Sequence, residues 1–215
     1  MKLIKNISGN RVIDLLNMSE SATGVEVATN GFSVYGFSEF LKQLDQSGPI
    51  KLILPADAPE LNKLWGDETE RELRNKLNAQ QLSQTSLEAL RDKVELRVSR
   101  SPLPQSIIAI EDEETGRTII GHCPLTAEGL GLAPSNALGL IQVSENTEEF
   151  TSLRAWFESA WESVPNAEAL NQSFVEELEF LAADKSPSLI YYLILHRLFR
   201  DTGEELDEER IVKSA

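Results

Sequence analysis

Cysteine and histidine are nearly absent from this chain of 215 residues, which contains one cysteine, Cys123, and two histidines, His122 and His196. A single cysteine excludes an intramolecular disulfide, and these residues together fall short of an ordinary Cys/His zinc site. No stretch approaches the ~18 apolar residues of a membrane-spanning helix, and the N-terminus lacks the apolar core of a signal peptide. We therefore expect a protein of the reducing cytoplasm that has no membrane contact and binds no metal or other cofactor in this segment.

Basic residues are scarce as well, with 20 Lys and Arg against 35 Asp and Glu and a formal net charge of −15. The net charge is −8 over residues 1–150 and −7 over residues 151–215. Both parts are therefore acidic, and no basic half is masked by an acidic tail. This balance argues against nucleic-acid binding through bulk charge alone. The hydrophobic fraction of 41% is that of an ordinary globular protein with one sizeable core.

The apolar pattern switches between strand and helix spacing, which predicts an α/β fold. Residues 24–29 alternate, residues 37–44 repeat at steps of three and four, and residues 50–54 form a short apolar run. A strand, a helix and a strand at this spacing are typical of a right-handed parallel crossover. Further helices are expected over residues 10–16, 67–77 and 87–94, and further strands over residues 95–98, 106–110, 117–120 and 138–143.

Past Asn146 the pattern is helical only. Helices are predicted around Phe150 to Trp161 and over residues 167–183 and 187–200, and a charged stretch follows. We therefore divide the chain into a domain over residues 1–163, a helical extension over residues 164–202, and a charged linker over residues 203–215 that leads to a further C-terminal region.

Conventional catalytic motifs are missing from the sequence. Gly129 and Gly131 have neither the spacing nor the lysine of a phosphate-binding loop. His122 and Cys123 are adjacent, and neighbouring side chains on a strand point to opposite faces, so the two cannot easily share a proton. The acidic run from Glu111 to Glu114 is typical of a solvated hairpin tip rather than of a metal site.

Residues 121–130 carry more information: they read Gly-His-Cys-Pro-Leu-Thr-Ala-Glu-Gly-Leu, and Asn136 and a helix with Phe157 and Trp161 follow. This stretch resembles the second half of the phospholipase D-like signature. In that superfamily a strand ends in Gly-Ser-x-Asn-Leu-Thr-x-x-Gly-Leu, and a helix with a Phe-x-x-x-Trp pattern closes the unit. Phe32-Ser33-Val34-Tyr35-Gly36 is similar to the family's Phe-Ser-x-x-Gly turn. The resemblance covers residues 10 to 163 and implies a mixed sheet flanked by helices, to which the helical extension is added.

The catalytic residues of the family are not retained. Its nucleases use a His-x-Lys pair, in which the histidine attacks phosphorus and the lysine neutralises phosphate oxygens. The resemblance places Pro104 and Ser106 at these positions, and His122 and Pro124 replace the serine and asparagine of the glycine motif. Proline has no imidazole and serine has no charge, so we expect no catalytic activity here. The remnant motif positions are Pro104, Ser106, Glu111 or Asp112, His122 and Asn136.

Among phospholipase D-like domains, the sequence looks most like those found N-terminal to bacterial DEAD/DEAH or Swi/Snf-type helicases. The resemblance implies an accessory domain that positions or regulates a nucleic-acid-processing helicase, whose ATP binding would belong to a region beyond this chain. The partners expected are this helicase region, nucleic acid bound through it, and a second copy of the domain. Two alternatives remain: an active phosphodiesterase or nuclease with a non-standard site around His122, and an acidic protein-interaction module.

Overall fold

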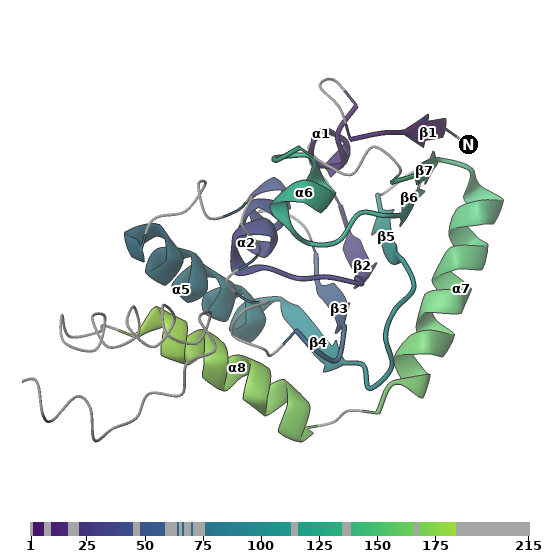
Figure 1. Ribbon diagram of the computed structural model, residues 1–215. Helices are drawn as coiled ribbons and strands as arrows, with labels where there is room; N and C mark the ends of the chain where they lie inside the picture. The colour runs from purple at the N-terminus through teal and green to yellow at the C-terminus, as the bar shows by residue number, and fades with distance from the viewer. Residues whose placement is uncertain are drawn as a thin grey trace, which may run out of the picture. The chain divides into compact units, whose positions relative to one another are not determined.

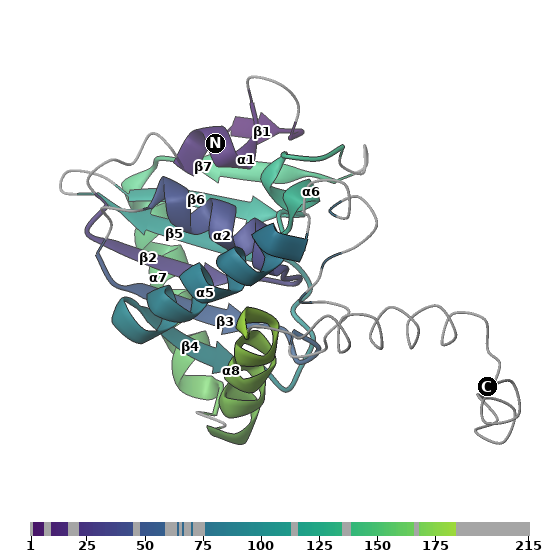
Figure 2. The same cartoon turned by 90° about the vertical axis from the view of Figure 1, so that its left-hand side faces the viewer.

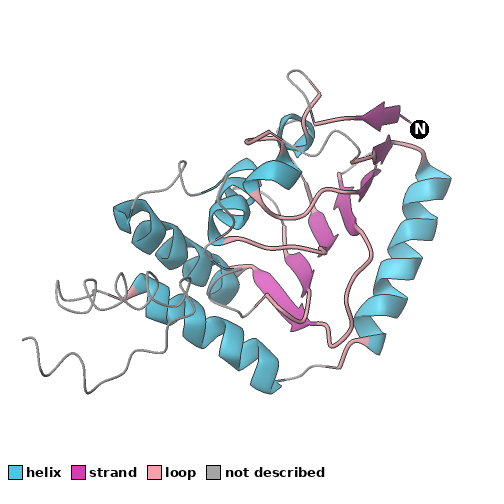
Figure 3. Cartoon of the chain, in the orientation of Figure 1, coloured by secondary structure: helices cyan, strands magenta, loops and turns pink. Residues whose placement is uncertain are grey.

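A computed structural model gives the fold of the chain and describes residues 2–6, 10–16, 22–44, 48–58, 64, 66, 70, 76–112, 116–134, 139–165 and 168–183. The chain divides into two compact units, Met1–Ala182 and Ala183–Ala215, and the account below concerns the first. It contains a seven-stranded mixed sheet in the order β1-β7-β6-β5-β2-β3-β4, with helices on both faces (Figures 1 and 3). The predicted α/β class, with a mixed sheet flanked by helices, is confirmed.

Most predicted elements are present near their expected positions. The strands are β1 (Lys2–Ile4), β2 (Gly24–Ala28), β3 (Ile50–Leu54), β4 (Val94–Val98), β5 (Ser106–Glu111), β6 (Gly116–Gly121) and β7 (Ile141–Ser144). The helices are α1 (Val12–Leu16), α2 (Val34–Gln43), α5 (Lys76–Asp92), α6 (Ala127–Leu130), α7 (Thr147–Ser163) and α8 (Glu168–Ala182). The sequence patterns missed the short β1 and α6, and they placed Val94 in a helix although it begins β4.

Several predictions fall on residues that the structure does not describe. The second C-terminal helix over 187–200 and the charged linker over 203–215 lie outside the described residues, as does most of the charged helix over 67–77. The division of the chain at residue 163 stays a prediction. The described helix α8, which follows this boundary, packs against α5 within the compact unit Met1–Ala182.

The parallel crossover from β2 through α2 to β3 is formed as predicted, with Val25 opposite Ile50 and Ala28 opposite Ile53. Ser33 caps α2 by accepting the backbone N–H of Gly36 at 3.0 Å. A Cβ atom on Gly36 would lie 2.5 Å from the carbonyl oxygen of Leu125. The Phe-Ser-x-x-Gly turn therefore starts the helix and also lets it approach the segment before α6.

Two cores cover the two faces of the sheet. In Figure 2, α2, α5 and α6 lie in front of the strands and α7 lies behind them. The larger core, on the side of α2, includes Phe37, Phe40 and Phe174. The smaller core lies under α7, where Phe157 and Trp161 pack against the sheet. Their spacing of four residues puts both rings on one face of the helix, as the sequence pattern predicts.

The outer edge of β4 is covered by side chains from the C-terminal part of the unit. The amide of Asn171, on α8, accepts the backbone N–H of Val98 and donates to the carbonyl oxygen of Leu96, each at 3.1 Å. A single side chain thus takes the place of a neighbouring strand and closes an edge that would otherwise pair with another chain. Within the described residues, no helix is both long and apolar enough to cross a bilayer.

Candidate functional site

The predicted motif position Ser106 lies at the start of β5, beside the residues that follow β2. Its side chain is fully buried, with 0% exposure. The hydroxyl donates to Oδ1 of Asn30 at 2.7 Å and accepts the backbone N–H of Asn30 at 3.1 Å. The hydroxyl of Thr29 is a further hydrogen-bond neighbour at 3.3 Å. We call Thr29, Asn30 and Ser106 the Ser106 cluster.

Thr29 joins this cluster to the glycine motif. Its hydroxyl donates to the carbonyl oxygen of Gly31 at 2.7 Å and accepts the backbone N–H of Leu125 at 3.1 Å. Neutral hydrogen bonds therefore surround the side chain at position 106, where the phospholipase D-like resemblance predicts a lysine in active members. Burying an ammonium group in such a site costs free energy unless a counter-charge is present.

The other motif positions that the structure describes do not assemble into a catalytic group. Gly121 pairs with Ser106 at the end of β6, so His122 follows close to the cluster, but its side chain is exposed. Pro104 is exposed in the loop before β5, and Asn136 lies outside the described residues. Cys123 is buried, and burial raises its thiol pKa to about 12, which makes it a poor nucleophile.

Glu111 lies at the opposite end of β5 from Ser106. The five residue steps from one to the other correspond to about 17 Å along a strand. Glu111 belongs instead to a pocket of about 170 Å³ between α7 and the sheet. We call it the Glu26 pocket, and its lining residues are Thr23, Gly24, Val25, Glu26, Pro49, Lys51, Glu95, Ala109, Glu111, Phe150 and Arg154.

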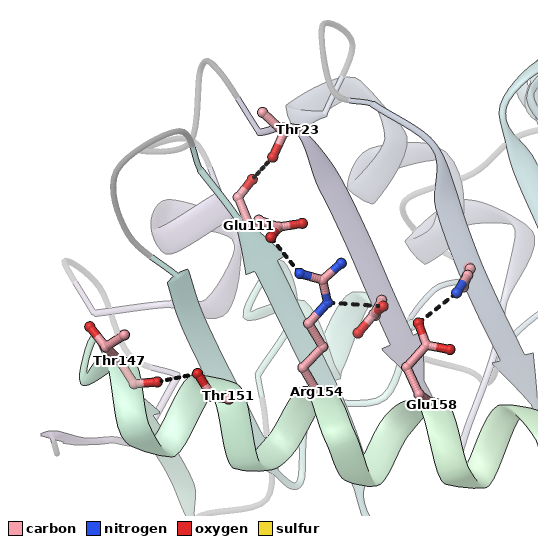
Figure 4. Close-up of polar contacts among 8 residues, drawn as sticks. Thr23, Glu111, Thr147, Thr151, Arg154 and Glu158 are labelled. Atoms are coloured by element: carbon pink, nitrogen blue, oxygen red, sulfur yellow. Dashed lines mark hydrogen bonds and ion pairs between the residues drawn. The ribbon is translucent and has the colours of Figure 1, made fainter.

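Arg154 and Glu158 on α7 reach the sheet and pair with charges from three strands (Figure 4). Arg154 forms a hydrogen-bonded ion pair with Glu111 and contacts Oε1 of Glu26 through Nε at 3.6 Å. Glu158 binds Nζ of Lys51 at 2.7 Å. Arg154 and Glu158 are one helical turn apart, and Glu26 and Lys51 are opposite each other in register, so both pairs face the same space.

Glu26 is the most buried charged residue of the pocket, with 8% exposure. Its Oε2 atom is buried and has no hydrogen-bond partner. Burial raises the pKa of Glu26, Arg154 acts against this, and the neighbouring Glu158 raises it further. The pocket therefore contains a carboxylate oxygen that can become protonated or can accept a hydrogen bond from another donor.

The sequence patterns did not identify Glu26 or Arg154 as candidate residues. The available signal was a carboxylate in the middle of the apolar strand Val25 to Ala28, but alternation alone would place it on a solvent face. In the described part of the chain, no group of three or more His, Cys, Asp or Glu is arranged to hold a metal ion.

Comparisons with known proteins leave the family of the chain open. No protein-family model matches the sequence, and no curated protein matches it. Among solved structures, the chain is similar to TrmBL2, an archaeal chromatin protein described as showing a novel mode of DNA binding, at 14% identity and a TM-score of 0.44. The match covers 77% of this chain and 54% of TrmBL2, so the chain spans about half the length of that protein. A similarity at this level carries no conclusion about function.

Proposed function

We propose that this chain is a catalytically inactive phospholipase D-like domain that serves a helicase or a related nucleic-acid-processing protein as an accessory part. The observation that carries the proposal is the Ser106 cluster. Where the family holds a lysine, the hydroxyl of Ser106 is buried and hydrogen-bonded to Asn30. This arrangement offers no positive charge to a phosphate. On this proposal, the domain keeps the scaffold of the superfamily, and a structural hydrogen-bond network replaces the group that would handle phosphate.

The loss of catalysis is tested with the purified chain, a generic phosphodiester and single-stranded DNA. We expect no cleavage above the buffer rate, and the same result for His122→Ala. Cleavage that His122→Ala abolishes would contradict the proposal and favour an active phosphodiesterase around His122. Among the described contacts, the His122 imidazole makes no hydrogen bond to a base that would activate it.

The accessory role is tested with the complete gene product. If its coding sequence continues beyond Ala215 into a helicase region, removal of residues 1–182 should change DNA-stimulated ATP hydrolysis or strand separation. Unchanged rates, or the lack of any helicase region, would contradict this part of the proposal. Light scattering then decides whether two copies associate, as the resemblance implies for a site shared between subunits.

An acidic protein-interaction module is the second candidate function. The net charge of −15 and the three carboxylates that line the Glu26 pocket favour a basic partner over a nucleic acid. Salt-sensitive binding of the chain to DNA would favour the accessory domain. Capture of a defined basic protein without DNA binding would favour the interaction module.

A further inference from the structure

The Glu26 pocket has an acidic mouth and partly apolar walls. Thr23, Pro49 and Glu95 lie at the exposed ends of the strands, whereas Glu26 and Ala109 are buried deeper. Because β2, β3 and β4 are parallel, the segments at which they begin meet at this end of the sheet. The Ser106 cluster lies at the opposite end, so the two sites are separate.

Apolar groups form the wall on the side of α7. The ring of Phe150 packs onto Gly116, where a Cβ atom would lie 2.3 Å from the ring. A short hydrocarbon stem can therefore lie against Phe150 and Ala109, which both line the pocket.

The cations of the pocket are all paired, whereas its carboxylates are not. Both cations are engaged, Lys51 by Glu158 and Arg154 by Glu111 and Glu26. Oε2 of Glu26 has no hydrogen-bond partner, and Glu95 at the mouth forms no ion pair among the described residues. A buried carboxylate oxygen without a donor is destabilising, because it has lost its water and gained no hydrogen bond in return. The pocket therefore favours a ligand that brings a positive donor to Glu26.

We propose that the Glu26 pocket binds a primary alkylammonium group, whose nitrogen donates to Oε2 of Glu26 and whose hydrocarbon stem lies against Ala109 and Phe150. A guanidinium group fits less well, because it needs two coplanar acceptors and Oε1 of Glu26 already faces Arg154. An ammonium group is compact and its three donors can point in different directions. Both a free alkylamine and a lysine side chain of a partner protein provide this chemistry.

The proposal is tested by titrating the full chain with n-butylammonium chloride and following amide chemical shifts of Gly24, Glu26 and Ala109. We expect saturable shifts at these residues. n-Butanol, which has the same stem without the charge, should produce none that saturate. Shifts of equal size with both compounds, or no saturable shift with the amine, would overturn the proposal.

Three variants make the test specific. Glu26→Gln keeps the size of the side chain and should weaken binding about tenfold, because a hydrogen bond to a charged group is lost. Gly24→Val should block the pocket. The Cβ atom that it adds is tolerated, because it would lie 3.7 Å from Oε2 of Glu111. Glu162→Gln removes the same charge at an exposed position of α7 outside the pocket and should bind as the wild type does. Equal affinity of Glu26→Gln and wild type would overturn the assignment.

A second titration separates the two sources of the ligand. A blocked tripeptide with a central lysine is compared with the same peptide containing norleucine, which lacks the amine. If the lysine peptide binds and competes with butylammonium, the pocket accepts a side chain of a partner protein. If only butylammonium binds, the pocket accepts free amines. If neither binds, the proposal is wrong.

Discussion

The two ends of the sheet satisfy their polar side chains in different ways. At the Ser106 cluster, neutral hydroxyl and amide groups form hydrogen bonds with one another and with backbone atoms. At the Glu26 pocket, charged groups from α7 and the strands are paired, and one carboxylate oxygen is left without a donor. The resemblance to a catalytic motif therefore points to the first end, whereas the carboxylate oxygen of Glu26 that lacks a donor lies at the second end.

The largest expected effect comes from placing a charge in the Ser106 cluster. Ser106→Lys introduces the residue type that the phospholipase D-like resemblance predicts for active members, but it buries an ammonium group among the hydroxyl and amide groups of the cluster. We expect a loss of about 3–5 kcal/mol in the free energy of unfolding, measured by urea denaturation. Gln105→Lys, at the neighbouring exposed position, should change it by less than about 0.5 kcal/mol. If Ser106→Lys were as stable as wild type, the cluster would be able to hold a charge.

A smaller effect is expected from removing a charge at the other end. Arg154→Met keeps the apolar stem but leaves Glu26 and Glu111 without their cation. Because the Arg154 side chain is 41% exposed, we expect a loss of only about 1 kcal/mol in unfolding free energy. Arg91→Met breaks the exposed pair with Glu179 and serves as the control, for which no measurable loss is expected. Equal losses in both variants would show that the pocket does not strengthen its ion pairs.

The third effect is a change in how the free energy of unfolding depends on pH. Burial raises the pKa of Glu26 above its ordinary value of 4.5, Glu158 acts in the same direction, and Arg154 and Lys51 oppose it. The folded protein therefore holds this proton more tightly than the unfolded chain does. The resulting contribution to stability is present in acid and is lost as the pH rises through the pKa of the folded state.

Glu26→Gln removes this dependence. As the pH rises through the pKa of Glu26 in the folded state, the stability of the variant should increase relative to that of the wild type. Urea denaturation at several pH values measures it, and Glu162→Gln on the exposed side of α7 should give a flat difference. A flat difference for Glu26→Gln as well would mean that Glu26 ionises in the fold as it does in the unfolded chain.

The smallest effect is expected at His122. Its side chain is exposed at the end of β6, so His122→Ala should change the free energy of unfolding by less than about 0.5 kcal/mol. The same urea denaturation measures it. A loss of several kcal/mol would show that His122 supports the Ser106 cluster, which would bring the two halves of the remnant motif into one structural unit.

Local patterns predicted the elements whose residues are neighbours in the sequence. The crossover from β2 to β3 and the hairpin of β5 and β6 could be recognised because their apolar repeats and turn residues lie within short windows. Strand β1 was missed because its three residues carry no repeat of their own and pair with β7, about 140 residues later in the chain. The Asn171 contact with β4 was missed for a similar reason, since a lone asparagine in a helix shows no sign of its partner.

The two candidate sites also differ in whether the sequence could predict them. The proposed replacement of histidine and lysine by Pro104 and Ser106 could be inferred from the sequence, because the motif is a linear spacing. The Glu26 pocket was not, because it requires α7 to lie across β2, β3 and β5, which are far apart along the chain. Alternation in β2 predicts that Glu26 faces away from Val25 and Val27, but it cannot tell whether that face is covered.

The sequence alone determined the α/β class, the acidic charge and the absence of a His-x-Lys pair, because these follow from composition, periodicity and linear spacing. Tertiary structure decided which polar groups are buried and with what partners. Contacts with distant segments give the Ser106 hydroxyl a structural role and bury the carboxylate of Glu26. The physical reason is that desolvation and pairing depend on what covers a side chain, and this is set by the packing of elements far apart in sequence.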